Sequence, residues 1–536
     1  MLWPVASAPV NADDRYWYLR VGHTSGGSYP GIFEWTYDEL PAASQSGRLA
    51  PFASVSRRLV GLAVMQFALA TATPVVVLQA VVKLVTFGLG IGACLAFLRS
   101  LRRRGAGGEL VRISGRTLAF VGAATALLTA AGSQAHSQFR NGWTSYAVLT
   151  WGSVVVVFGL VALALWLLRK VAARPRVATG PAVLVLVVAA VFLNFSYELV
   201  YITAPAVLLA LLLQPVGTPG DRWGHWRPKL VVGSSFLGAF AITFVSLRVW
   251  LAGVCERNDC YTGVEPQLTV GALRTMAYNL VGAIPVAGGN ELRADLERVG
   301  LGDRYPVPVT AWSIALAVVA AASLLALWWG TRPRSVSKVA DLAEPAGRRT
   351  PGAEAADRRA QGLVLLGAAL VAVAVAVGEA VVMGLSVQAE EIVTQPGLPY
   401  RHTMITWTGL AFALVCVCVA AHHLLGRSSL AQRVVGALGA GVLAIAVGAG
   451  AAVVTPQNAA ATTANRLDPR LLASETLQWE VVLGDRTPEG DDRRCAVLDR
   501  VRETLGDNPT TDSIVRDAER AFVFHHGMSF CSTDGG

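Results

Sequence analysis

Two adjacent carboxylates, Asp13 and Asp14, are the first residues of the chain whose types and spacing suggest chemistry. Neighbouring acids repel each other, which favours one of them remaining protonated. Such a pair suits a general base, or two oxygen ligands for a divalent cation such as Mg²⁺ or Mn²⁺. The alternative interpretation is a solvated acidic turn in which an aspartate caps a surface helix.

Basic side chains are the second group of interest. Arg15, Arg48 and Arg401 are candidate phosphate ligands, because a guanidinium group can hold phosphate with two hydrogen bonds. The alternative for these arginines is anchoring to lipid headgroups. Lys83 lies inside an apolar stretch, where a charge costs about 2.5–3.5 kcal/mol. It should therefore either face a polar cavity, where it could contact a phosphate, or extend to the outer interface.

The composition places these residues in a membrane protein. Of the 536 residues, 53% are hydrophobic and only 15% are charged, whereas soluble proteins carry about 25% charged residues. Mean hydropathy is +0.49. These values argue against a disordered, fibrous or ordinary cytosolic protein. The net charge of +9 indicates membrane orientation rather than nucleic-acid binding if the basic residues lie in short loops.

A helix needs about 20 apolar residues to cross a hydrocarbon core of about 30 Å. The sequence predicts an all-α polytopic membrane protein with about ten transmembrane helices, at 75–98, 117–132, 146–168, 178–194, 199–213, 230–252, 309–330, 362–384, 405–425 and 434–455. The opening residues MLWPVASAPV resemble the outer end of a helix, so we expect a further N-terminal span upstream. The alternative is that the first span carries a short N-terminal arm across the membrane.

The loops between these spans alternate in charge. One set, which carries 22 Arg or Lys residues, comprises 99–116, 169–176, 214–229, 331–361 and 426–433. The intervening loops 133–145, 195–198 and 385–404 carry one, none and one. The positive-inside rule places the basic set in the cytoplasm. We therefore predict a multi-pass protein of the plasma (inner) membrane with an extracytoplasmic C-terminus.

Three parts follow along the chain. An outside loop, 1–74, carries the acidic pair and an interfacial helix near 57–72. The transmembrane domain, 75–455, includes the outside loop 253–308 and the cytoplasmic linker 331–361. A small helical extracytoplasmic domain spans 456–536. Four cysteines fall in outside segments, and disulfides persist in oxidising compartments, so we predict the pairs Cys255–Cys260 and Cys495–Cys531.

Four short motifs share the predicted outer face. They are Asp13-Asp14, Gly47-Arg48-Leu49-Ala50-Pro51, Asn194-Phe195-Ser196-Tyr197-Glu198 and Pro399-Tyr400-Arg401-His402. In these motifs and in topology, over roughly residues 1–425, the chain resembles the GT-C superfamily of integral-membrane glycosyltransferases. Within that superfamily it resembles the bacterial branch that includes the O-antigen glucosyltransferases.

The resemblance implies transfer of a sugar from a polyprenyl-phosphate donor to a cell-envelope glycan, lipid or protein on the outer face. Asp13 or Asp14 would be the base or a metal ligand. The predicted substrate contacts are Arg15, Arg48, Lys83, Glu198, Tyr400, Arg401 and His402. Two other functions stay open: a transporter or flippase of a lipid-linked envelope precursor, and a non-catalytic envelope assembly protein.

Overall fold

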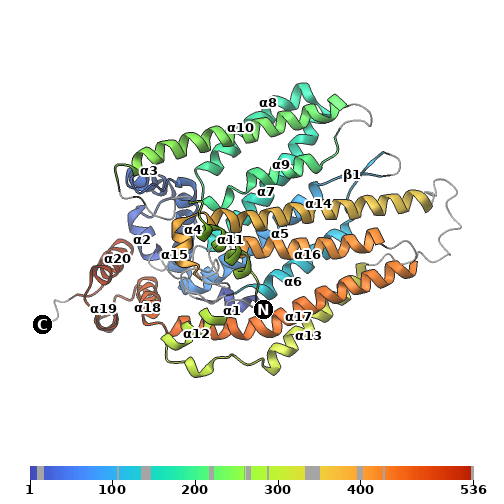
Figure 1. Ribbon diagram of the computed structural model, residues 1–536. Helices are drawn as coiled ribbons and strands as arrows, with labels where there is room; N and C mark the ends of the chain where they lie inside the picture. Colours follow the sequence, from blue (N-terminus) through green and yellow to red (C-terminus); the bar gives the residue numbers. More distant parts are fainter. Residues whose placement is uncertain are drawn as a thin grey trace.

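The protein is almost entirely helical. The computed structural model describes residues 1–8, 17–105, 108–134, 147–216, 222–258, 260, 267–285, 289–331, 351–394, 403–425 and 429–532. In this part of the chain the only strands are β1 (Arg103–Arg104) and β2 (Leu110–Val111), which form a short antiparallel hairpin. The predicted all-α class is therefore confirmed (Figure 1).

Every predicted span coincides with a helix of the bundle. These helices are α5 (Val75–Ser100), α6 (Gly115–Gly132), α7 (Ala147–Ala173), α8 (Pro175–Asn194), α9 (Thr203–Leu213) preceded by η2 (Glu198–Val200), α10 (Arg222–Cys255), α13 (Ala311–Thr331), α14 (Pro351–Gly384), α16 (Thr403–Leu425) and α17 (Ser429–Leu467).

Nine helices of the described residues are long and apolar enough to cross a membrane. Eight of them belong to the predicted ten; α6 and α9 do not meet these limits, and the ninth is α4 (Pro51–Thr71).

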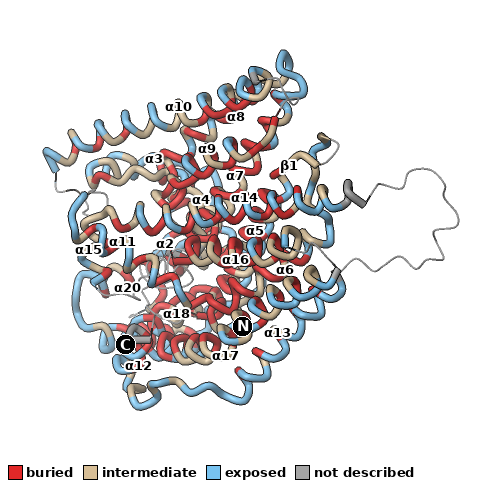
Figure 2. Tube along the Cα trace, turned by 45° about the vertical axis from the view of Figure 1, so that its right-hand side comes forward, coloured by how far each residue is buried: buried red, intermediate tan, exposed pale blue. Residues whose placement is uncertain are grey.

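The bundle has an apolar core and an apolar outer surface. Phe97, Phe158 and Phe412 meet in the core, with ring centroids 5.8 to 6.4 Å apart. The outward stripe of α14 instead exposes large apolar side chains at helical spacing: Leu363, Leu366, Leu370, Val373, Val377 and Val381. A soluble protein rarely exposes so continuous an apolar surface. These faces fit a lipid environment, as expected for a multi-pass membrane protein (Figure 2).

The described residues of the two predicted sets of loops lie at opposite ends of the bundle. The hairpin β1–β2 packs against α14 at one end (Figure 1). The opposite end carries α1 (Leu2–Ala6), α2 (Trp17–Thr24), α3 (Tyr29–Gln45), α4, α11 (Val270–Gly282), α12 (Gly289–Arg298), η4 (Gly302–Arg304) and α15 (Val387–Ile392). We call this the polar-loop end.

Helix α4 differs from the predicted surface helix at 57–72. It begins at Pro51, whose fixed φ suits a first helical position, and ends at Ala72, which is left-handed at φ 48°. It packs against both α2 and α3. Arg58, near the predicted start of this helix, is only 2% exposed inside the packed layer, which does not fit a polar residue on a membrane surface.

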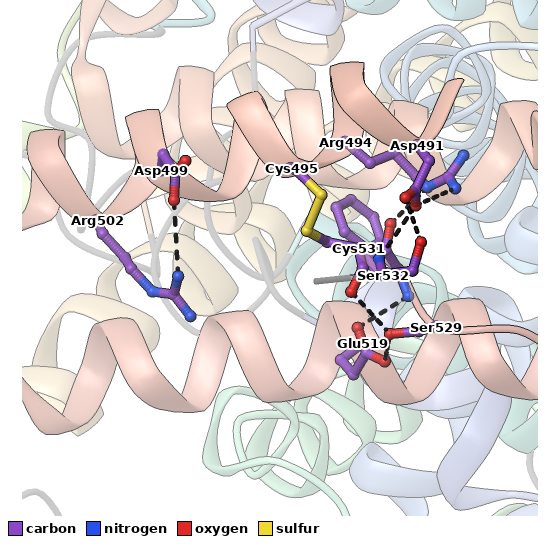
Figure 3. Close-up of a disulfide and its surroundings, with 10 residues drawn as sticks. Asp491, Arg494, Cys495, Asp499, Arg502, Glu519, Ser529, Cys531 and Ser532 are labelled. Carbon is purple, nitrogen blue, oxygen red and sulfur yellow. Dashed lines mark hydrogen bonds and ion pairs between the residues drawn. A yellow bond between two sulfur atoms is a disulfide. The ribbon is translucent and has the colours of Figure 1, made fainter. Parts of the chain in front are cut away.

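The C-terminal residues form three helices, α18 (Pro469–Leu483), α19 (Pro488–Leu505) and α20 (Pro509–His526). Each begins with a proline preceded by a capping side chain, namely Asp468, Thr487 or Asn508. The disulfide Cys495–Cys531 fastens the segment after α20 to α19, as predicted (Figure 3). Beside it, the Asp491 carboxylate pairs with the Arg494 guanidinium at 2.9 Å.

These three helices are not separate from the rest. Leu477, Val481, Ile514 and Phe522 share one hydrophobic core with residues of α2 and α4, among them Leu19, Leu62 and Met65. The predicted boundary at 455–456 lies within a continuous helix, because α17 runs on to Leu467.

Candidate functional site

The Gly47–Pro51 motif forms the turn between α3 and α4. Gly47 has φ 75°, a left-handed conformation that favours glycine. The Arg48 amide donates to the Ala43 carbonyl at 3.0 Å, which fixes the start of the turn. The motif therefore reverses the chain and presents Arg48 between the two helices.

The Cys255–Cys260 disulfide, which was also predicted, supports this turn. A methyl group placed on Gly47 would lie 2.8 Å from the Cys260 sulfur and 2.9 Å from the Cys255 sulfur. The Cys260 sulfur also approaches the Gln45 carbonyl oxygen at 3.7 Å. Two features therefore require glycine at position 47: its left-handed backbone conformation and the close approach of the disulfide.

The Tyr197–Glu198 turn meets the same region. The Arg48 guanidinium lies 5.4 Å from the centre of the Tyr197 ring, and Tyr197 is 5% exposed. One residue into α4, the Phe52 amide donates to the Phe195 carbonyl at 3.1 Å. Two of the four sequence motifs, far apart along the chain, are therefore in contact. Glu198 itself begins η2 and does not line the cavity described next.

A cavity of about 190 Å³ opens between α3, α4 and these two turns. We call it the arginine cavity. Its charged lining consists of Arg48, Arg57, Arg58 and Glu39, and Tyr197 closes one side. Among the described residues that line the cavity, three guanidinium groups face one carboxylate. Such a cavity suits an anion, because each guanidinium can donate two parallel hydrogen bonds to phosphate oxygens.

Arg58 is held rigidly by side chains of α3. It pairs with the Glu39 carboxylate and donates to the Thr36 hydroxyl at 2.8 Å. Its guanidinium also stacks 3.8 Å from the Trp35 ring centre. The Trp35 ring in turn donates to Glu39 at 2.7 Å. Glu39 was not predicted as a site residue. Its i, i+4 spacing from Trp35 on a helix was the only signal for it in the sequence.

Lys83 lies elsewhere, under the first residues of the chain. Its ammonium group donates to the Ala8 carbonyl at 2.7 Å, and the residue is 1% exposed. It is therefore buried against the backbone rather than extended to the interface. The Arg466 guanidinium donates to the neighbouring Ser7 carbonyl at 3.2 Å. Burial raises the pKa of Glu475 nearby, and the charges of Arg466 and Lys83 partly oppose that rise.

Six predicted site residues lie outside the described part of the chain: Asp13, Asp14, Arg15, Tyr400, Arg401 and His402. The residues on either side of the acidic segment are described. Ala8 is held by Lys83, and Trp17 begins α2. Thr403, which begins α16, is 1% exposed. Within the described ranges, no group of three or more His, Cys, Asp or Glu side chains could hold a metal ion.

Comparisons with protein-family models, with curated proteins and with solved structures gave no match.

Proposed function

We propose that the protein is a membrane glycosyltransferase of the GT-C type, which moves a sugar from a polyprenyl-phosphate donor to a cell-envelope acceptor. One observation carries the proposal: the arginine cavity joins Arg48 of the Gly-Arg-x-x-Pro motif to Tyr197 of the Tyr-Glu turn. An anion-binding cavity at the end of an apolar bundle suits a donor with a phosphate head and a hydrocarbon tail.

The chemistry needs a base and a phosphate clamp. In the proposed step the acceptor hydroxyl attacks the anomeric carbon, and Asp13 or Asp14 takes the hydroxyl proton. The bond from the anomeric carbon to the phosphate oxygen breaks, and polyprenyl phosphate leaves with the electron pair. Arg48 and Arg57 would stabilise that leaving charge through hydrogen bonds that strengthen as it develops. Arg15, Tyr400, Arg401, His402 and Glu198 remain proposed substrate contacts.

The proposal is tested by envelope glycan analysis of a deletion strain complemented with four genes: intact, Asp13→Asn/Asp14→Asn, Arg48→Gln and Arg304→Gln. Arg304 is an exposed arginine at the same end of the bundle and serves as the control. A sugar missing from the deletion strain should return with the intact and control genes only. Removing one charged phosphate contact should slow transfer by about 10- to 100-fold.

Matched membrane levels of the variants are needed for a clear outcome. Full restoration by the aspartate variant would remove the acidic pair from the chemistry and favour the non-catalytic assembly role. Full restoration by Arg48→Gln would remove the arginine cavity from donor binding.

Transport of a lipid-linked precursor is the second candidate, and Glu379 favours it. This residue of α14 is fully buried, and neither carboxylate oxygen has a hydrogen-bond partner among the described residues. Ionisable groups inside membrane spans often serve transport pathways. If the protein is a transporter, cells that carry the Glu379→Gln variant should lack the glycan. The purified intact protein should then transfer no sugar from a short-chain donor in detergent. Sugar transfer by the purified protein would decide against transport.

A further inference from the structure

A second concentration of positive charge lies at the opposite end of the bundle, where α5, α7, α9 and α10 meet the β1–β2 hairpin (Figure 1). Backbone contacts fix this junction. The Arg102 amide donates to the Gln214 side-chain oxygen at 3.1 Å, and the Arg169 guanidinium donates to the Ser100 carbonyl. The Lys229 ammonium reaches the Leu212 carbonyl at 3.3 Å. The junction is independent of the arginine cavity and of the proposed function.

Six cations gather there, which we call the basic cluster: Arg99, Arg102, Arg103, Arg112, Arg169 and Lys229. Two of them are buried, Arg102 at 8% and Lys229 at 6% exposed. Burial, together with the charges of Arg112, Arg169 and Arg99, lowers the pKa of Arg102 to about 10. Burial lowers the pKa of Arg103 as well.

The Asp357 carboxylate reaches the hairpin at Gly105, but none of the six cations forms an ion pair with a carboxylate in the part of the chain that the structure describes. The Nη1 atom of Arg102 is buried and makes no hydrogen bond to the described residues. Burying a charge without a partner is costly, so such groups are normally neutralised by an opposite charge.

Membrane orientation alone does not account for this arrangement. The positive-inside rule needs basic residues near span ends, and exposed ones satisfy it. Arg116, in the first turn of α6 at the same end of the bundle, is exposed in that way. Arg102 and Lys229 are instead withdrawn from solvent. Arg102 lies near Arg112, Arg169 and Arg99, and Lys229 lies near Arg103. Their burial is explained if an anion occupies the junction.

We propose that the basic cluster binds a phosphate group between the end of α5, the hairpin, α7 and α10. Phosphate fits because its oxygens accept the forked pairs of hydrogen bonds that guanidinium groups donate. It also carries enough charge to offset several cations at once. The phosphate belongs either to an anionic lipid headgroup at this end of the bundle or to a soluble phosphate compound, which share the same chemistry.

The test measures thermal unfolding of the full-length protein in lipid nanodiscs. In phosphatidylcholine nanodiscs, inorganic phosphate is compared with chloride at matched ionic strength. In a second arm, phosphatidylglycerol replaces part of the phosphatidylcholine. The variants are Arg102→Gln, the exposed-site variant Arg112→Gln and the control Arg116→Gln. The intact protein should gain about 2 °C or more in at least one arm, because a ligand of the folded state raises Tm.

Arg102→Gln should abolish this gain, Arg112→Gln should reduce it and Arg116→Gln should preserve it. Without phosphate, Arg102→Gln should unfold no earlier than the intact protein, since it removes repulsion. A gain only with phosphatidylglycerol assigns the group to a lipid headgroup, and a gain with inorganic phosphate assigns it to a soluble anion. The proposal is wrong if the intact protein gains no stability in either arm. It is also wrong if Arg112→Gln keeps the full gain. If Arg102→Gln does not fold, the result for Arg112→Gln decides the test.

Discussion

Arg57 and Arg58 are neighbours in sequence, but α4 gives them different surroundings. Arg58 is buried among Trp35, Thr36 and Glu39, whereas Arg57 is half-buried at the cavity wall. A buried cation held by three partners stabilises the fold. A cation at the wall of a cavity can contact a ligand inside that cavity. The same residue type therefore has two predicted roles at adjacent positions.

The first prediction separates these roles. Arg58→Gln should lower the free energy of unfolding by about 2 kcal/mol. This loss is smaller than the loss expected when one partner of a fully buried ion pair is removed, because Glu39 is half-exposed. Arg57→Gln should leave stability within about 0.5 kcal/mol and lower glycan transfer. Thermal unfolding of both variants, with transfer measured in parallel, checks this. Equal loss of stability in the two variants would contradict the assignment.

At the scale of elements, the α3–α4 turn and the Cys255–Cys260 disulfide form one unit. The turn presents Arg48, and the disulfide fills the space where a Gly47 side chain would stand. The position of a cavity residue thus depends on a covalent bond formed more than two hundred residues later in the chain. Reduction of that bond should loosen the turn without opening the bundle.

A glycine pair tests this dependence. Gly47→Ala meets both a left-handed backbone and the disulfide sulfurs, whereas Gly26, at φ 59°, has nothing within 4 Å of an added methyl group. Gly26→Ala should cost only the backbone strain, about 1–2 kcal/mol. Gly47→Ala should cost more and should also lower transfer activity. The measurements are thermal unfolding and glycan analysis, and indistinguishable variants would show that the disulfide contact is unimportant.

The helices could be predicted from the sequence, but their contacts could not. Apolar windows of about 20 residues identify spans because bilayer thickness dictates their length. The ion pair of Arg58 with Glu39 depends instead on how α3 folds back on α4, which no local pattern specifies. The end of α17 was misplaced for a related reason. Polar residues after 455 suggested a new domain, but Asn458 and Thr462 bond to the Ser133 and Pro4 carbonyls at 2.6 Å within one continuous helix.

At the scale of the whole molecule, the C-terminal helices complete a core that begins with α2. Phe522 of α20 is fully buried in this shared core and stacks 4.5 Å from the Arg494 guanidinium. The membrane bundle has its own core around Phe97 and Phe412. Damage to α20 should therefore disturb the polar-loop end and spare the bundle.

Phe522→Ala tests this coupling. A large-to-small change at a fully buried position costs about 3–5 kcal/mol. We expect limited proteolysis to cut the variant within 17–71 and 468–532 while the bundle helices stay protected. The exposed-face variant Val523→Ala is the matched control, since Val523 is 45% exposed. Uniform proteolysis of the Phe522→Ala variant would indicate one cooperative unit instead.

The contact between α2 and α20 should also weaken in acid. The His525 ring packs on Gly22, where an added methyl group would lie 2.6 Å from Nε2. Burial first, and then His526 and His23, lowers the pKa of His525 to about 4. Burial lowers the pKa of His23 too, although the Asp517 carboxylate 3.9 Å away opposes that change.

The sign follows from proton uptake. Between pH 6.5 and 4 the unfolded chain binds a proton at residue 525 that the folded protein does not. The free energy of unfolding should therefore decrease as the pH is lowered from 6.5 to 4. The expected decrease is about 2 kcal/mol after allowance for solvent reaching the ring. Thermal unfolding at pH 7 and pH 5 should differ less in His525→Gln than in the intact protein. The control Arg516→Gln, on the exposed side of α20, should keep the full pH dependence.

A core built from segments far apart in the chain has a consequence for biosynthesis. Residues of α2 and α4 leave the ribosome well before their partners in α18 and α20. At about 5–20 residues per second, translation separates the two by on the order of half a minute. During that time the apolar faces of α2 and α4 lack their covering. The nascent chain should therefore depend on a holding chaperone or on the membrane surface until α18 and α20 emerge.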